Sequence, residues 1–252
     1  MLALHHYQDS EIVINYNDAL IFGRDLALFE SKTAWLNDAC IFYQLARLQQ
    51  QYDPSAQALL FLDPAVVSFL MHQVQDEDEM RDFASGYHHF RRTKRILVPI
   101  NDNMGSSHWQ TPGLGSHWSL LVVILPLAKV SSRFFHFDSV VGSNRGAAQA
   151  VACKLYQAIQ LAKQWSNFNE QGGTLETTVL MDECTAPQQK NGFDCGMHVL
   201  ANAEVLRGDD VDDYEENGPG RLAERDPCFP EHLRSRIAQD IRQLASLAAS
   251  KP

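Results

Sequence analysis

Residues 115–125 read G-S-H-W-S-L-L-V-V-I-L, so a short polar segment runs directly into an unbroken apolar run. The apolar part is rich in β-branched residues and predicts a strand over 119–125. Two runs of the same kind, 96–100 and 134–138, lie on either side of it in the sequence. We expect these three strands to form a central sheet, with His117 at the sheet edge where the middle strand begins.

Segments with helical periodicity surround these strands. Residues 35–52 repeat apolar side chains at helical spacing, and Ser31 or Thr33 is available as the N-cap. The alternation of segments predicts an α+β fold, with a central mixed β-sheet flanked by helices, in a single domain over 1–252. Further elements are predicted as helices beginning near Asp63-Pro64 and over 146–165, 196–207 and 231–249, with another strand over 176–181.

Polar and charged segments interrupt this pattern. Residues 101–116 are rich in Gly, Ser, Asn and Pro, a composition typical of a mobile loop or lid. Residues 209–219 hold six acidic side chains with Gly and Pro, which predicts an exposed insertion. The acidic run 76–79 and the basic run 91–95 are interpreted as solvated surface.

Composition excludes several classes of protein. The 252 residues are 45% hydrophobic, enough to bury one large domain, and the net charge of -10 offers no cationic surface for nucleic acid. The most apolar run, 120–127, is too short to cross a membrane. The five cysteines form no C-x-x-C pair, which favours a reducing cytoplasmic or nuclear compartment. We expect a monomer that needs no metal or other cofactor.

A cysteine, a histidine and a carboxylate are placed where they suit nucleophilic catalysis. Cys195 follows a polar loop and opens an apolar helix, where unpaired backbone N–H groups and an adjacent imidazolium lower a thiol pKa to about 3.5 to 7.5. Asp138 ends the third strand, so it reaches His117 if the second and third strands are neighbours. The amide of Gln189, six residues before Cys195, and the backbone N–H of Cys195 are candidate donors for an oxyanion hole.

Four short motifs carry a resemblance to a known family. They read W-L-N-D at 35–38, H-W-S-L-L-V at 117–122, F-F-H-F-D-S at 134–139 and Q-K-N-G-F-D-C-G at 189–196. In this order the chain resembles the ubiquitin-like-protein proteases, or sentrin-specific proteases, of cysteine peptidase clan CE; papain-like enzymes run Cys, His, Asn instead. The I-N-D-N at 100–103, the D-S at 138–139 and the compact length resemble the deneddylase branch most.

The resemblance implies a papain-like clan CE cysteine protease fold and a role for each of four catalytic residues. Cys195 is the nucleophile, His117 the general base and acid, Asp138 the carboxylate that orients it, and Gln189 the oxyanion donor. A second Ser-His-Trp, at 107–109, precedes the one that contains His117. We prefer His117 because only it runs directly into an apolar strand that can hold it rigidly.

The resemblance also implies how a substrate is held. Trp35 and Trp118 sandwich the diglycine tail of a ubiquitin-like modifier, since a slot between two indole planes admits only residues without a Cβ. Asp38 beside Trp35 is placed to hold an arginine in that tail. The remaining polar residues are given structural roles. We expect Asp102 to form a turn, Asp194 to cap the helix that Cys195 opens, and His198 to pack on that helix. We expect His136 to be structural or solvent-facing and the other four cysteines to be ordinary thiols.

These implications together predict a cysteine isopeptidase and C-terminal processing enzyme. Its partner is a ubiquitin-like modifier and its conjugates, and the neddylation modifier is favoured. A SUMO-specific protease of the same family is the first alternative. An acyltransferase built on the same triad and a non-catalytic binder of ubiquitin-like proteins are the others. The intact triad argues against the binder, and the paired tryptophans suit a diglycine tail better than an acyl-CoA.

Overall fold

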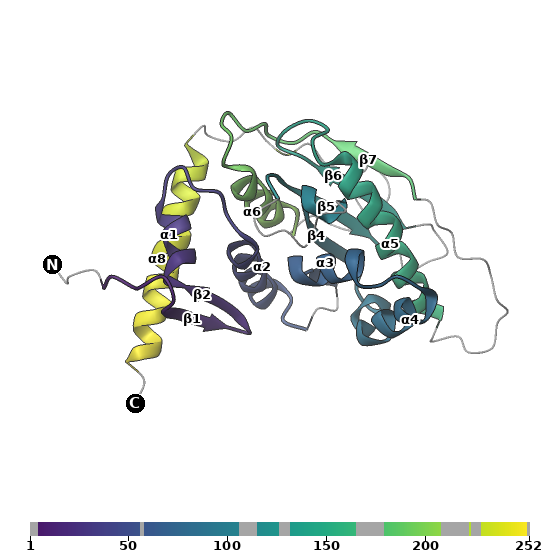
Figure 1. The fold of residues 1–252 in the computed structure, drawn as a ribbon, viewed down its shortest axis with the longest axis horizontal. Helices are drawn as coiled ribbons and strands as arrows, with labels where there is room; N and C mark the ends of the chain where they lie inside the picture. Colours follow the sequence, from purple (N-terminus) through teal and green to yellow (C-terminus); the bar gives the residue numbers. More distant parts are fainter. Residues whose placement is uncertain are drawn as a thin grey trace.

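The computed structural model describes residues 5–55, 58–105, 115–125, 132–164, 179–207, 222 and 228–250. Within these residues a five-stranded mixed sheet lies at the centre, in the order β3-β4-β5-β6-β7 (Figure 1). The middle three strands are antiparallel, and the two outer pairs, β3–β4 and β6–β7, are parallel. The strands are β3 Leu59–Phe61, β4 Arg95–Asn101, β5 Trp118–Ile124, β6 Arg133–Phe137 and β7 Met181–Cys184. The predicted fold class and the three adjacent strands are confirmed.

The central strands are buried on both faces. All seven residues of β5 and all seven of β4 are buried, which explains why both read as apolar runs rather than as an alternation. Helix α6, Cys195–Leu206, packs on β5 on one side of the sheet. Helices α5, Arg145–Gln164, and α3, Pro64–His72, cover the other side, and α4, Glu77–Gly86, packs against α5 (Figure 1).

A second layer packs beside α2, Asp38–Tyr52, away from the main sheet (Figure 1). It combines α1, Gly23–Glu30, and α8, Phe229–Ala249, with a hairpin of β1, Ile12–Tyr16, and β2, Ala19–Phe22. The sequence analysis predicted α8 but neither the hairpin nor α1. The two turn residues of the hairpin, Asn17 and Asp18, have positive φ angles of 48° and 66°. Asn and Asp tolerate this left-handed conformation, and two-residue hairpin turns require it. No described helix is both long and apolar enough to cross a membrane.

Several predicted boundaries are wrong. The N-cap of α2 is Asn37 rather than Ser31 or Thr33: its Oδ1 accepts a hydrogen bond from the backbone N–H of Cys40 at 3.0 Å. The predicted strand 176–181 overlaps the observed strand β7 only at Met181, where β7 begins. Three predicted segments lie outside the described residues: 176–178 of this strand, 106–114 of the lid and the whole of 209–219. Residues 102–105 of the lid form a 3₁₀ helix, and a second one spans His88–Arg91.

The acidic run is exposed, as predicted, and also has a structural role, whereas the basic run is not simply solvated surface. The acidic run opens α4: Oδ1 of Asp76 accepts the N–H of Glu79 at 2.9 Å, and the Glu79 carboxylate accepts the N–H of Asp76 at 3.3 Å. This reciprocal pair is a capping box, and acidic residues in a first turn also suit the helix dipole. At the end of the basic run, Arg95 is buried in β4 and donates to the carbonyl of Leu206.

The capping box gives a prediction for stability. The change Asp76→Ala removes the N-cap of α4 and is expected to lower the free energy of unfolding by about 1 kcal/mol. The measurement is urea denaturation followed by circular dichroism. Asp82→Ala is the matched control, because Asp82 is exposed and lies in the same helix beyond its first turn. Equal losses in the two variants would contradict the assignment.

Candidate active site

His117 and Asp138 meet at one end of the sheet. His117 immediately precedes β5, and Asp138 immediately follows β6. Because the two strands are antiparallel and pair Leu120 with Phe137, the start of one lies beside the end of the other. Nε2 of His117 lies 2.6 Å from Oδ1 of Asp138, and both side chains are buried. The structure thus brings these two predicted residues into direct contact.

The Asp138 carboxylate is held by two backbone amides as well. The N–H of Val140 donates to Oδ1 at 3.0 Å, and the N–H of Asn144 donates to Oδ2 at 2.9 Å. Burial opposes ionisation, but the hydrogen bonds from His117 and from these amides outweigh it and lower the pKa of Asp138. The group is therefore a fixed, ionised acceptor for the imidazole.

His117 also forms a hydrogen bond with the side chain of Cys195. Burial by itself lowers the imidazole pKa, but the hydrogen bonds to Asp138 and to Cys195 outweigh it and raise the pKa of His117 to about 9. His117 is therefore protonated at neutral pH. Since Asp138 engages Nε2, Nδ1 is the ring nitrogen left for the sulfur. A protonated imidazole beside a thiol favours the nucleophilic thiolate.

Cys195 is the first residue of α6, where backbone N–H groups carry a partial positive charge. The next residue, Gly196, packs tightly on the segment that precedes α2. A Cβ on residue 196 would lie 3.0 Å from Cβ of Leu36. The lack of a side chain at this position is what allows the start of α6 to approach residues 35–38.

The turn before His117 is shaped by Asp102, as predicted. Its Oδ1 accepts the N–H of Ser116 at 2.8 Å and that of His117 at 3.2 Å. Gly115 lies so close to Asn101 that a Cβ would sit 2.1 Å from the Asn101 Oδ1. The competing Ser-His-Trp at 107–109 lies outside the described residues.

Gln189 lies beside the loop that follows β6. Its backbone N–H donates to the carbonyl of Ser139 at 2.9 Å, and its Oε1 accepts the Ser139 hydroxyl at 2.8 Å. Its Nε2 donates to the carbonyl of Asn191 at 2.6 Å. The amide is thus anchored at both ends next to Asp138, and one N–H of Nε2 remains for a further acceptor. Its role as an oxyanion donor stays a prediction.

The three predicted substrate-binding residues line one groove. Trp35, Asp38 and Trp118 line it together with Leu36 and residues of α3, and its volume is about 550 Å³. Trp118 is buried, and its Nε1 donates to the carbonyl of Leu36 at 3.0 Å, whereas Trp35 is 50% exposed. Leu36, which lines the groove, also lies against Gly196 at the start of α6.

Arg234 is a buried residue of this region that the sequence analysis missed. From α8, its guanidinium donates to Oδ1 of Asp194 at 3.0 Å through Nη2 and 3.3 Å through Nε. It also donates to the carbonyls of Leu28, Ala34 and Phe193, at 3.0, 2.7 and 3.4 Å. One side chain therefore ties α8 to the segment before the groove and to the loop before Cys195. No local motif distinguishes it, because its partners are distant in the sequence.

This contact corrects the expectation for Asp194. Asp194 occupies the N-cap position of α6, but its side chain makes no capping hydrogen bond because the carboxylate faces Arg234. His198 packs on Phe229 of α8, with ring centroids 4.9 Å apart, a partner that the sequence did not predict. His136 is fully buried rather than solvent-facing, so the structural alternative holds.

Cys40 and Cys184 do not resemble activated nucleophiles. Burial raises the pKa of the Cys40 thiol, and burial with nearby carboxylates raises that of Cys184 to about 12. Among the described residues, no group of three or more His, Cys, Asp or Glu side chains is arranged to hold a metal ion.

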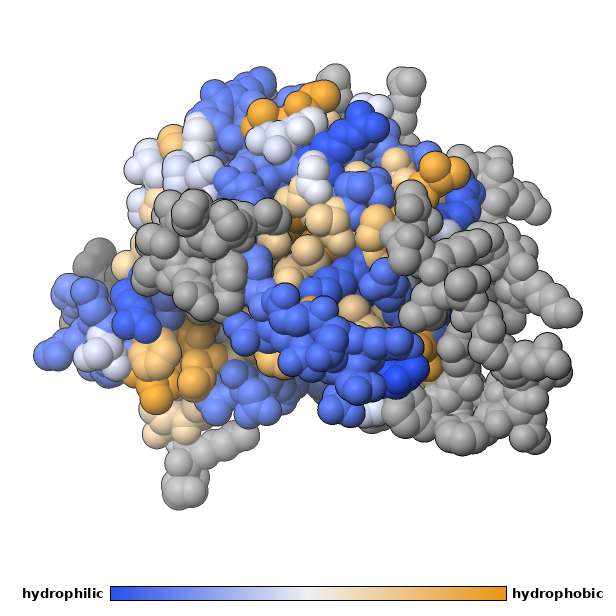
Figure 2. All heavy atoms as spheres, turned by 45° about the vertical axis from the view of Figure 1, so that its right-hand side comes forward, coloured by the Kyte–Doolittle hydropathy of each residue, from blue (hydrophilic) through white to orange (hydrophobic). Residues whose placement is uncertain are grey.

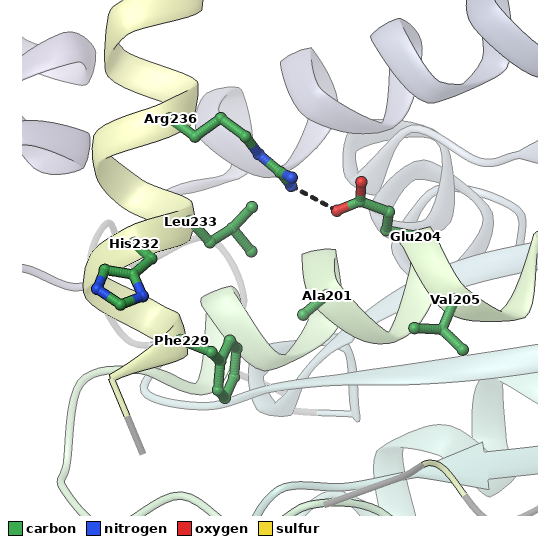
Figure 3. Close-up of a pocket in the computed structure, with 7 residues that line it drawn as sticks. All are labelled: Ala201, Glu204, Val205, Phe229, His232, Leu233 and Arg236. Carbon is green, nitrogen blue, oxygen red and sulfur yellow. Dashed lines mark hydrogen bonds and ion pairs between the residues drawn. The ribbon is translucent and has the colours of Figure 1, made fainter. Parts of the chain in front are cut away.

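Figure 2 shows one face on which weakly hydrophobic atoms gather in a central hollow between hydrophilic regions. Another hollow, of about 330 Å³, lies between α6 and α8 (Figure 3). Phe229, Leu233 and Val205 line it, and Arg236 forms an ion pair with Glu204 at 2.7 Å across its edge. None of the predicted site residues lines this second hollow.

Comparison with known proteins identifies the family of this chain. Residues 34–217 match the family described as "Ulp1 protease family, C-terminal catalytic domain". The chain is 29% identical to the NEDD8-specific protease 1 of Arabidopsis thaliana over 248 residues, which cover 96% of this chain and 98% of the relative. It is 30% identical to the sentrin-specific protease 8 of Mus musculus over 196 residues, 77% of each chain.

Solved structures share the fold at lower sequence identity. The C-terminal Ulp1 protease domain, determined in complex with Smt3, the yeast ortholog of SUMO, superimposes with a TM-score of 0.63 at 18% identity. That match covers 94% of this chain and 89% of the Ulp1 chain. The Xanthomonas campestris effector XopD, bound to ubiquitin, gives a TM-score of 0.55 at 23% identity and covers 82% of this chain and 92% of XopD. The family match spans most of the chain, and we conclude that this protein is a cysteine protease of the Ulp1 family.

Proposed function

We propose that this protease is a deneddylase, which hydrolyses the bond after the C-terminal diglycine of the neddylation modifier. The observation that carries the proposal is the groove lined by Trp35 and Trp118, whose lining residue Leu36 lies against the start of the helix that begins with Cys195. Similarity to NEDD8-specific protease 1 along nearly the whole of both chains supports this choice of modifier. A reactive thiol also suits a reducing cytoplasmic or nuclear compartment.

The chemistry follows from the three side chains in contact. The Cys195 thiolate attacks the carbonyl carbon of the last glycine, and the C–N bond to the leaving amine breaks as His117 donates its proton to that amine. The acyl-enzyme is a thioester. Neutral His117 then takes one proton from water, whose oxygen attacks the thioester. The C–S bond breaks to return the thiolate, and the glycine leaves as a carboxylic acid that loses its proton to solvent. Asp138 holds the imidazole in one orientation through both steps.

The tail of the modifier lies between the two indoles in this proposal. Trp118 forms a fixed wall because its ring is bonded to the Leu36 carbonyl, and a slot beside it excludes residues with a Cβ. The Asp38 carboxylate lines the same groove and suits an arginine next to the diglycine. The groove therefore accounts for selection of the tail.

The nucleophile gives the first functional prediction. We expect Cys195→Ala to reduce hydrolysis of a NEDD8-aminomethylcoumarin substrate by about 10⁴-fold or more, because no other described thiol contacts His117. Binding of NEDD8, measured by isothermal titration, should persist, since the groove is unchanged. Cys184→Ala is the control and should retain activity. A fully active Cys195→Ala enzyme would refute the assignment.

The pKa of His117 gives a prediction for pH. Because the pKa is raised to about 9, the imidazolium is present at neutral pH and is lost as the pH rises through about 9. We expect kcat/KM to fall over that range. Asp138→Asn removes the negative charge that favours the imidazolium, so the alkaline limit should move to lower pH and the rate should drop. A variant whose alkaline limit stays near 9 would show that Asp138 does not set this pKa.

Modifier choice is tested with activity probes. Vinyl-sulfone derivatives of NEDD8, SUMO and ubiquitin all place an electrophile at the position of the scissile carbonyl. We expect the NEDD8 probe to label Cys195 fastest, by at least about tenfold, a difference of about 1.4 kcal/mol. Labelling is followed by gel shift and peptide mass spectrometry. Faster labelling by the SUMO probe would assign the enzyme to the SUMO-specific branch instead.

A further inference from the structure

A second set of polar side chains is buried in the sheet next to His117 and Asp138. Ser119 lies on β5, His136 on β6 and Glu183 on β7. His136 pairs with Leu121 on one side and with Glu183 on the other, and Ser119 is two residues from Leu121. Because residues two apart in a strand and residues paired across strands share a face, all three polar side chains point the same way. Ser119 and His136 are 1% and 0% exposed.

These three side chains form a directed chain of hydrogen bonds. Nδ1 of His136 lies 3.0 Å from both carboxylate oxygens of Glu183, and Nε2 lies 2.8 Å from Oγ of Ser119. A carboxylate only accepts, so Nδ1 carries a proton, and in the neutral imidazole Nε2 is then an acceptor. The Ser119 hydroxyl therefore donates to His136, which leaves the oxygen lone pairs of Ser119 to accept from elsewhere.

Asn144 makes that connection. Its Nδ2 lies 3.1 Å from Oγ of Ser119, 3.2 Å from the carbonyl of His117 and 3.3 Å from the carbonyl of Ile100. The two carbonyls can only accept, so the nitrogen of the amide must face this way. The backbone N–H of Asn144 donates to Oδ2 of Asp138 at 2.9 Å. One residue thus bonds to both His117 and Asp138.

We propose that a relay of four residues, Glu183, His136, Ser119 and Asn144, positions the His117–Asp138 pair for catalysis. Glu183 fixes the tautomer of His136, which fixes the Ser119 hydroxyl, which in turn fixes the amide of Asn144. Ser119, His136 and Glu183 have the residue types of a hydrolytic triad. They are positioning residues, however, because Ser119 and His136 are too buried to meet a substrate. The inference rests on the proposed roles of Cys195 and His117.

Glu183 is the point at which the relay can be broken with least risk to folding. Its side chain is 30% exposed, at the outer end of the relay. Removing it leaves the Nδ1–H of His136 without its acceptor and allows either tautomer. The inner residues are then free to rotate, and a misplacement of the catalytic imidazole well below 1 Å already lowers turnover.

The test compares substitutions at two adjacent carboxylates of β7. We expect Glu183→Ala to lower kcat for the NEDD8-aminomethylcoumarin substrate by about five- to tenfold, with KM changed less than about twofold. Glu183→Gln keeps an oxygen acceptor for Nδ1–H and should restore kcat to within about twofold of the wild type. Asp182→Ala is the matched control: its carboxylate is 65% exposed, lies outside the relay and should leave both parameters unchanged.

A second readout needs no modifier. The rate at which iodoacetamide alkylates Cys195, followed by peptide mass spectrometry, should fall in Glu183→Ala and recover in Glu183→Gln, while alkylation of the exposed Cys228 serves as the internal reference. Unchanged kcat and alkylation in Glu183→Ala, or a change confined to KM, would overturn the relay. A wild-type enzyme that cleaves no modifier, but whose Cys195 alkylation responds to Glu183→Ala, would refute the proposed function and leave the relay standing.

Discussion

The contact of 2.6 Å between His117 and Asp138 depends on the register of β5 and β6. The two residues stand just outside paired strands, so their separation is set by the backbone ladder and not by flexible loops. A slip of one residue would turn every side chain of β5 to the opposite face of the sheet. The apolar residues that bury both faces of β5 therefore also decide whether an imidazole and a carboxylate meet.

The position of the Cys195 sulfur relative to this pair is fixed by other contacts. Cys195 belongs to helix α6, which packs on β5. Two contacts fix the position of the start of this helix: Gly196 packs against Leu36, and Arg234 binds Asp194. Arg234 also holds the carbonyl that precedes Trp35. The wall of the groove and the loop before the nucleophile thus share one buried cation. A shift of α8 would change both together.

The sequence predicted those parts of the molecule whose signal is local. The strands around His117 and Asp138 and the helices α2, α3, α5, α6 and α8 all lie in short apolar or motif-bearing stretches. The seven proposed site residues lie in such stretches too, and their roles stay predictions. The chain gave weaker signals for the hairpin turn at Asn17 and Asp18 and for the capping box of α4, and both were passed over. Asn37, whose cap partner Cys40 is only three residues away, was a local signal that was also passed over. Arg95 in a strand and Arg234 under the site were out of reach for another reason. Their environment is made by segments far away in the sequence, and a charged residue in isolation is most simply placed at the surface.

Two buried polar clusters, the Arg234–Asp194 pair and the relay around His136, contribute little to the stability of the fold. Taking the Arg234–Asp194 pair out of water carries a desolvation penalty that its Coulomb attraction only partly offsets, and apolar side chains of similar volume often stabilise a protein at least as well. The same holds for the imidazole of His136, buried between β5 and β7. What such groups provide that apolar packing does not is direction, because each hydrogen bond fixes the angle as well as the distance between two atoms. One cluster fixes the loop that carries the nucleophile and the other fixes the turn that carries its base. Since the reacting atoms must be aligned within a fraction of an ångström, polar contacts that constrain orientation are useful at these two places even where they add little to stability.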